Sequence, residues 1–283
     1  MVFGSALNLQ NIGERAGRVI IARMLVGAMN YPGRSIAKEL HRISDDGFDF
    51  VDLTLEPPSA WPADGVEIGR LMGDLGLTGV GHTAWYLPIA SPFTELRDVA
   101  RDAFRRAFDV FAGAGINLVN VHPDPRVPLH PADRIRKRNA EVIGALAEDA
   151  AQRGIRLMVE NIDRMFCDVD ELRVVLDETD ELGFHLDVGH ANLHLGARAP
   201  NRTAALVGAF ADRLAHVHVS DNRGGGEDLH LPLGAGTIDW RAAIRALKAG
   251  GYDGTVTLEV FSREREHLRV SRRLWLGWWS ETT

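Results

Sequence analysis

Short apolar stretches alternate with longer amphipathic stretches along most of the chain. Each apolar stretch is rich in β-branched or aliphatic residues and ends in a polar turn, a pattern typical of a buried strand followed by a helix. Between them, residues 93–115 and 131–154 show helical spacing, with charged residues on one face and Ala, Leu and Val on the other. We count eight apolar stretches, at residues 24–31, 48–56, 77–84, 116–124, 155–162, 182–192, 214–222 and 252–261.

Glycines mark the points where helices are expected to end. Glycine is preferred just after a helix because it adopts the left-handed conformation without strain. Eight strands alternating with eight helices predict an α/β fold, a single-domain (β/α)8 TIM barrel, with an open doubly wound sheet as the alternative. The glycines are Gly47, Gly76, Gly115, Gly154 and Gly251.

The composition indicates one globular domain. The chain has 283 residues, of which 45% are hydrophobic and 25% charged, and this is enough to bury one large core. Residues 1–23 carry Glu14, Arg15, Arg18 and Arg23, which interrupt any apolar segment of a secretory signal. We interpret residues 1–23 as an N-terminal extension and residues 24–283 as the barrel domain.

The net charge, the cysteine content and the tryptophans indicate which partners and which compartment to expect. A formal net charge of -7 without a basic run disfavours nucleic acid as a partner, and no apolar run approaches the length of a membrane span. The single Cys167 excludes an intrachain disulfide and is typical of the reducing cytoplasm. A helix face or a homo-oligomer contact would explain Trp275, Trp278 and Trp279.

Polar residues stand at the carboxyl ends of seven of the expected strands. In a parallel barrel these ends meet at the one face where barrel enzymes have their sites. Unpaired buried carboxylates cost several kcal/mol each, so a cluster of them needs a cation or shared protons. The pattern therefore predicts a divalent metal site. The residues are Glu56, His82, His122, Glu160 with Asn161, Asp187 with His190, His218 with Asp221, and Glu259.

Five motifs at these positions resemble those of the xylose isomerase-like barrel superfamily, which includes sugar-phosphate isomerases and epimerases, ketose 3-epimerases, inosose dehydratases and endonuclease IV-type nucleases. The resemblance covers residues 24–261. The motifs are Val-Glu-Asn at 159–161, Leu-Asp-Val-Gly-His-Ala-Asn at 186–192, His-Val-His-Val-Ser-Asp-Asn at 216–222, His-Leu-Pro-Leu-Gly-Ala-Gly-Thr-Ile-Asp-Trp at 230–240, and Tyr-Asp-Gly-Thr-Val-Thr-Leu-Glu at 252–259.

The resemblance implies roles for individual residues. The implied metal ligands are Glu160, Asp187, His218 and Glu259. The implied substrate contacts are His82, His122, Asn161, His190, Arg223 and His230. One departure concerns the ketose 3-epimerases, which carry a substrate-binding Glu six residues after the fifth-strand ligand, where this chain has Phe166.

The implied function is a metal-dependent sugar or sugar-phosphate isomerase or epimerase. Three carboxylates and one imidazole form an oxygen-rich ligand set that suits Mn²⁺, Mg²⁺ or Co²⁺, and such an ion would stabilise an enediolate. Glu160 and Glu259 would be the catalytic acid and base on either side of the bound sugar. Loss of hydroxide from the same intermediate would give an inosose-type dehydratase, which the sequence leaves open.

A multi-zinc, endonuclease IV-like phosphodiesterase or AP endonuclease is the alternative from another class. In those nucleases additional zinc ions are held at the positions of His82, His122, Asp228 and His230, the last two forming an Asp-x-His pair. Two or three zinc ions with a bridging hydroxide could hydrolyse a phosphodiester. The acidic chain without a basic run favours the sugar enzyme.

Overall fold

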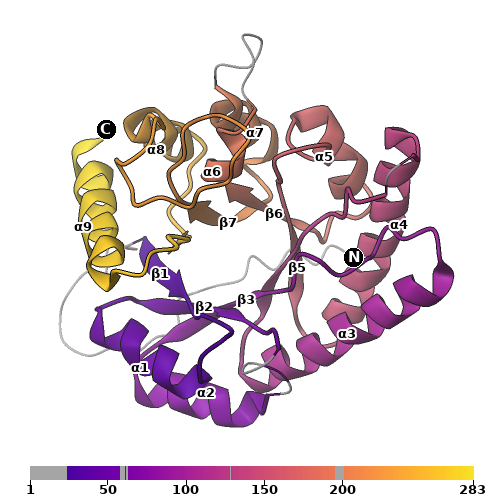
Figure 1. Cartoon of the computed structure of the whole chain (residues 1–283), viewed down its shortest axis with the longest axis horizontal. Helices are drawn as coiled ribbons and strands as arrows, with labels where there is room; N and C mark the ends of the chain where they lie inside the picture. Colours follow the sequence, from indigo (N-terminus) through magenta and orange to yellow (C-terminus); the bar gives the residue numbers. More distant parts are fainter. Residues whose placement is uncertain (1–23, 58–60, 62, 128, 195–200) are drawn as a thin grey trace, which may run out of the picture.

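Eight parallel strands close into one barrel in chain order, and helices surround them (Figure 1). The predicted (β/α)8 barrel is confirmed. The computed structural model describes residues 24–57, 61, 63–127, 129–194 and 201–283, so the expected extension at residues 1–23 lies outside the described residues. The strands are β1 (Leu25–Met29), β2 (Phe50–Thr54), β3 (Thr78–His82), β4 (Leu118–Val121), β5 (Arg156–Glu160), β6 (Gly183–Asp187), β7 (Leu214–Val219) and β8 (Thr255–Leu258).

Each strand is followed by a helix, and two helices follow β6. The five glycines expected at helix ends all have positive φ, between 69° and 75°. They therefore end the helices as predicted. The helices are α1 (Ile36–Asp45), α2 (Gly65–Asp74), α3 (Thr94–Gly113), α4 (Ala132–Ala151), α5 (Val169–Leu176), α6 (Val188–Ala191), α7 (Arg202–Phe210), α8 (Trp240–Ala249) and α9 (Arg265–Glu281).

The sixth strand is shorter than its apolar pattern indicates. The sequence predicts one strand over residues 182–192, but β6 ends at Asp187 and the next residues form α6. The Asp187 carboxylate caps this helix by accepting the backbone N–H of His190 at 2.6 Å. A capping interaction of this kind satisfies a free N–H group of the first turn and so starts a helix.

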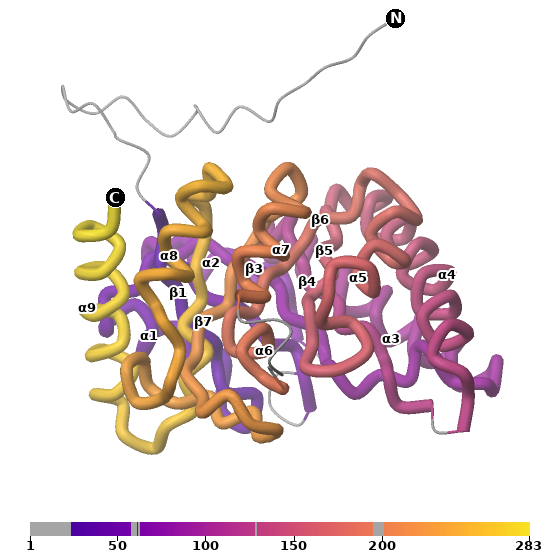
Figure 2. Tube along the Cα trace, turned by 90° about the horizontal axis from the view of Figure 1, so that it is seen from above, coloured from indigo at the N-terminus to yellow at the C-terminus, as the bar shows by residue number. Residues whose placement is uncertain are grey.

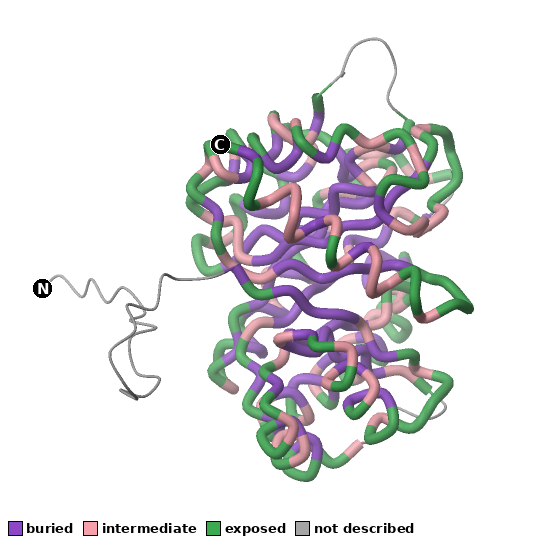
Figure 3. The backbone as a smooth tube through the Cα atoms, turned by 90° about the vertical axis from the view of Figure 1, so that its left-hand side faces the viewer, coloured by how far each residue is buried: buried purple, intermediate pink, exposed green. Residues whose placement is uncertain are grey.

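The interior of the barrel changes from apolar to polar along the strands. Phe50, Val80 and Met158 form a small buried cluster separate from the main core, which lies between strands and helices. Side chains two residues further along the same strand point to the same side. Asp52 follows Phe50 in this way and His82 follows Val80, and both polar side chains are buried. Buried backbone runs through the middle of the molecule in Figure 3. The polar layer therefore lies inside the fold, toward the carboxyl ends of the strands.

Helix α9 closes the ring of helices between α8 and α1 (Figures 1 and 2). In α9, the Nε atom of Arg269 lies 2.6 Å from Oδ1 of Asp46 at the end of α1, and Arg265 forms an ion pair with the same carboxylate. Trp275 is fully buried, 6.0 Å from the ring of Trp240 in α8. This tryptophan therefore packs within the chain.

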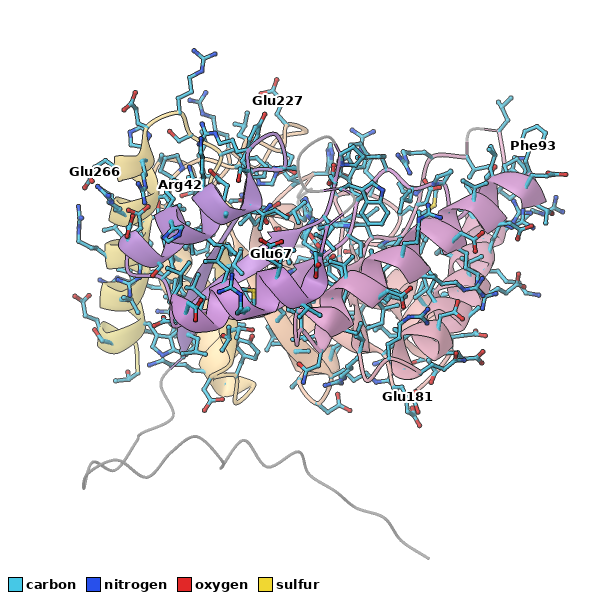
Figure 4. The ribbon with its side chains drawn as sticks, turned by 90° about the horizontal axis from the view of Figure 1, so that it is seen from below. Arg42, Glu67, Phe93, Glu181, Glu227 and Glu266 are labelled. Carbon is cyan, nitrogen blue, oxygen red and sulfur yellow. The ribbon has the colours of Figure 1, made fainter. Side chains whose placement is uncertain are left out.

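The two ends of the barrel carry different loops. Figure 4 shows Glu227 and Phe93, from the loops after β7 and β3, toward the edge opposite Glu181, which lies in the loop before β6. The predicted site residues belong to the first of these two ends. Among the described residues, no helix combines the length and apolar character needed to cross a membrane.

Candidate metal centre

The four predicted metal ligands come together at the carboxyl ends of four adjacent strands. Glu160 ends β5, Asp187 ends β6, His218 lies near the end of β7 and Glu259 follows β8. One donor atom of each residue lies within 4.8 Å of a donor atom of every other. All four side chains are buried. Three carboxylates and one imidazole therefore share one small space.

This cluster has the properties of a divalent cation site. Asp187 Oδ2 is buried and has no hydrogen-bond partner among the described residues. Burial raises the pKa of Asp187 to about 7, and Glu259 and Glu160 add to this effect while His190 opposes it. A positive ion among these oxygens would remove the cost of crowding buried carboxylates. The donor set therefore fits a hard divalent ion.

Glu160 is held in one orientation by three neighbours. Its Oε2 accepts the amide N–H of Asn120 at 2.8 Å and lies 2.9 Å from His122 Nε2 and 3.2 Å from His185 Nδ1. Burial alone would raise the pKa of Glu160, but His122 and His185 hold it well below its usual range. The side chain is thus a fixed carboxylate.

Glu259 lies between two histidines. Its Oε2 is 3.1 Å from His218 Nδ1 and 3.7 Å from His230 Nδ1. Burial would raise the pKa of Glu259, but His230 and His218 lower it to about 2. Both candidate catalytic carboxylates are therefore ionised at neutral pH and able to accept a proton.

Asp228 joins two more histidines beside this cluster. Its Oδ2 lies 3.0 Å from His190 Nε2 and 2.9 Å from His230 Nε2. Burial would lower the pKa of each histidine, but the surrounding carboxylates, which include Asp187 and Glu259, raise that of His190 well above its usual range and that of His230 to about 9. Without an added ion, these protonated imidazoles balance the negative charge of the site.

His82 and His122 also lie beside Glu160. Their ring centroids are 5.0 Å apart, and neither nitrogen of His82 has a hydrogen-bond partner among the described residues. Burial, reinforced by His122, lowers the pKa of His82 to about 4, so this ring is neutral at pH 7. Donor atoms of His82, Glu160 and His218 also lie within 4.8 Å of one another. The ring is thus an additional nitrogen donor beside the four predicted ligands.

A cavity of about 960 Å³ opens above these residues. It is lined by most of the predicted site residues and by three exposed aromatic side chains, Tyr31, Trp85 and Phe261. The guanidinium carbon of Arg126 lies 5.1 Å from the ring centroid of Trp85. The volume is sufficient for a substrate of several tens of atoms. The predicted residues in the lining are Glu56, His82, His122, Glu160, His190, Asp228, His230 and Glu259.

Two predicted substrate contacts lie elsewhere. Asn161 is fully buried, and its amide accepts the backbone N–H of Asp187 at 2.8 Å and donates to the carbonyl of Asp187 at 2.9 Å. It therefore positions the backbone of a predicted metal ligand. Arg223 is exposed in the loop after β7 and is not among the residues that line the cavity.

Besides Asn120, the strand-end pattern did not single out Asp52 and His185, which are also buried polar residues of the site. Asp52 in β2 lies with Oδ2 2.6 Å from His218 Nε2, and His185 in β6 contacts Glu160. Burial would raise the pKa of Asp52, but His218 and His216 hold it well below its usual range; burial lowers the pKa of His185 to about 3. The available signal was an acidic or imidazole side chain inside an apolar run, at Asp52 in residues 48–56 and at His185 in 182–192.

Comparisons with known proteins agree with this geometry. A family model described as Xylose isomerase-like TIM barrel matches residues 40–276. A ketose 3-epimerase of Arthrobacter globiformis is 23% identical over 268 residues, which cover 91% of this chain and 89% of that protein. A probable endonuclease 4 of Mycobacterium leprae is 25% identical over 217 residues, covering 73% and 83%. An uncharacterized protein of Methanocaldococcus jannaschii is 29% identical, but the match spans only 56% of this chain and 54% of that protein.

Solved structures show the same fold. A D-tagatose 3-epimerase-like protein superposes with a TM-score of 0.80 at 22% identity, over 92% of this chain and 98% of that chain. A Thermus thermophilus protein whose crystal was soaked with ZnCl2 superposes with a TM-score of 0.73 at 25% identity, over 92% and 100%.

Proposed function

Because this chain belongs to the xylose isomerase-like TIM barrel family, we propose that it is a divalent-metal-dependent isomerase or epimerase of a sugar or sugar phosphate. The reaction is proton transfer at a carbon next to a carbonyl. The observation that carries the proposal is the buried cluster of Glu160, Asp187, His218 and Glu259 at a cavity large enough for a sugar. The ketose 3-epimerase relative supports the same reaction class.

The two glutamates have complementary roles in this proposal. Glu160 and Glu259 come from β5 and β8, three strands apart around the barrel. One carboxylate takes the proton from the carbon, and the other exchanges a proton on the opposite side of the substrate. A bound divalent ion would supply charge stabilisation at the carbonyl and the neighbouring hydroxyl. His190 and His230, which line the cavity and contact Asp228 through Nε2, would lie against the bound sugar.

The test is a screen of ketoses, aldoses, inososes and their phosphates, with Mn²⁺ present, in deuterated water. Incorporation of deuterium at the carbon next to the carbonyl would support the proposal. The variants Glu160→Gln and Glu259→Gln should lower this exchange by about 10²- to 10⁴-fold. Glu181→Gln, on the opposite end of the barrel, is the matched control. Exchange near the wild-type rate in both site variants would contradict the acid–base roles. Loss of water from an inosose in the same screen would instead identify the dehydratase.

A multi-zinc phosphodiesterase is the second candidate because additional donors lie around the same cluster. Asp228 holds His190 and His230 together, and His82 and His122 lie beside Glu160, so two further ions could find ligands. Metal analysis after loading with Zn²⁺ or Mn²⁺, together with an assay on DNA containing an abasic site, separates the candidates. One ion per chain without cleavage supports the sugar enzyme, and two or three zinc ions with cleavage would overturn it.

A further inference from the structure

Asp52 reaches across the inside of the barrel to His218. It is the middle residue of β2, and β7 lies three strands away around the closed barrel. The carboxylate Oδ2 nevertheless lies 2.6 Å from His218 Nε2. Both side chains are buried. This contact therefore connects a candidate metal ligand to a residue 166 positions away along the chain.

The surroundings of Asp52 fix its carboxylate. Thr257 in β8 donates its hydroxyl to the same oxygen at 2.9 Å, and His216 Nε2 lies 3.4 Å from it. A buried carboxylate is unfavourable unless charged or hydrogen-bonding groups offset the lost hydration. An apolar residue in this layer would avoid that cost. The carboxylate therefore needs an explanation other than core packing.

The contact determines which nitrogen of His218 carries a proton. A histidine that binds a metal ion is a neutral imidazole, with one N–H and one lone pair. When an ion lies between Nδ1 and the other ligands, the proton belongs on Nε2, because a carboxylate oxygen lies 2.6 Å from that nitrogen and accepts its N–H. The other nitrogen, Nδ1, faces Glu259 Oε2 at 3.1 Å and Asp187 Oδ2 at 4.0 Å. Its lone pair is then directed at the other candidate ligands.

Neighbouring rings keep the imidazole in this position. The ring of His185 contacts His218 edge-on, with centroids 4.1 Å apart, and the ring of His82 stacks parallel to it at 5.7 Å. His216, two residues earlier on β7, lies 5.2 Å away and is held by the hydroxyls of Thr255 and Thr257. These contacts position the ring, and only Asp52 Oδ2 contacts its Nε2 within hydrogen-bond distance among the described residues.

We propose that Asp52 is a positioning residue for the metal centre. It holds His218 as the Nε2–H tautomer, so that Nδ1 binds the divalent ion together with Glu160, Asp187 and Glu259. This inference rests on the proposed function only in requiring that an ion binds there. Carboxylates that orient a metal-binding histidine in this way contribute about 10- to 100-fold to metal affinity in other proteins.

The variant Asp52→Asn tests this role because it keeps the shape and removes the charge. Thr54→Val is the matched control: Thr54 is buried two residues further along β2, and its hydroxyl has no hydrogen-bond partner among the described residues. Calorimetric titration of the chelator-treated, full-length proteins with Mn²⁺ should give roughly 10- to 100-fold weaker binding for Asp52→Asn and unchanged binding for Thr54→Val. Thermal unfolding of the metal-free variants checks that each is folded.

The outcomes separate the two proposals. Equal Mn²⁺ affinity of the wild type and Asp52→Asn would overturn the role of Asp52 and leave the proposed function standing. Failure of the wild type itself to bind Mn²⁺ would overturn the proposed function. A second measurement needs no variant: nitrogen NMR of ¹⁵N-histidine-labelled wild type loaded with Zn²⁺ should show His218 protonated at Nε2. Protonation at Nδ1 would overturn the inference, even if Asp52→Asn does not fold.

Discussion

Trp240 donates its indole N–H to Asp221 Oδ2 at 3.0 Å, and this contact ties the start of α8 to the end of β7. The fully buried Asp221 also accepts backbone N–H groups from Asn222 and Gly234, each at 2.9 Å. The sequence pattern groups Asp221 with the site residues. In the structure it anchors residues 222–238, the loop that carries Asp228 and His230 to the cavity.

Replacement of this anchor should destabilise the fold. Asp221→Ala would leave an indole and several backbone N–H groups without an acceptor, so we expect the free energy of unfolding to fall by about 3 kcal/mol. Urea denaturation measures this loss. Asp212→Ala, which removes an exposed carboxylate just before β7, serves as the control and should change stability little. Equal stabilities of the two variants would show that Asp221 is not an anchor.

Helices α2 and α3 approach closely at Gly65. A Cβ atom at this position would lie 2.2 Å from the carbonyl oxygen of Val110 in α3. Because backbone must move to admit it, Gly65→Ala should lower stability by about 1 to 3 kcal/mol. Gly73→Ala in the same helix meets no atom within 4 Å and should be neutral or stabilise by up to about 1 kcal/mol. Thermal unfolding of the pair tests this contrast, and similar melting temperatures would refute it.

Asp149 should contribute stability that depends on pH. Burial would raise its pKa, but hydrogen bonds from Arg101 and Arg105 lower it overall. A carboxyl whose pKa is lower in the folded than in the unfolded chain stabilises the protein above its unfolded pKa of about 4 and loses this effect as the pH falls. Asp149→Asn should therefore be less stable at pH 7, by no more than about 1 kcal/mol because the arginines are partly exposed.

Urea denaturation of wild type and Asp149→Asn at several pH values measures this difference. The two curves should converge as the solution is acidified below about pH 4. A difference that stays constant down to strongly acidic pH would indicate that Asp149 acts through packing.

A bound divalent ion should stabilise the folded chain. An ion that binds only the folded state adds about 2.7 kcal/mol when its concentration is 100 times its Kd. Treatment with a chelator should therefore lower Tm, and Mn²⁺ should restore it. In Asp187→Asn, which lacks one buried carboxylate of the cluster, this increase should be largely lost. The same increase in wild type and variant would place the ion elsewhere.

The architecture could be predicted from the sequence because each element has a local signal. Apolar runs gave the strands, and glycines such as Gly115 and Gly154 gave the ends of helices. The exception is the end of β6, where Val188, Gly189 and Ala191 continue the apolar pattern but residues 188–191 form a helix. That boundary depends on the Asp187 side chain capping α6, and hydrophobic periodicity does not record such a hydrogen bond.

The site could be predicted only in part. Glu160 and Glu259 stand at strand ends, and the parallel barrel brings such residues to one face wherever they occur in the chain. Asp52 lies in the middle of β2, and its contact with His218 depends on which residues of opposite strands share a layer inside the barrel. The tilt and stagger of the strands determine this, and no single strand carries that information.

The pairing of β1 with β8 has a consequence for the order of synthesis. Leu25 in β1 pairs with Thr255 in β8, and the Asp46 carboxylate is contacted by arginines of α9 that lie more than 200 residues later in the chain. A ribosome therefore releases seven strands before the barrel can close. The nascent chain should carry an open sheet edge and no assembled ion site until β8 and Glu259 have been made.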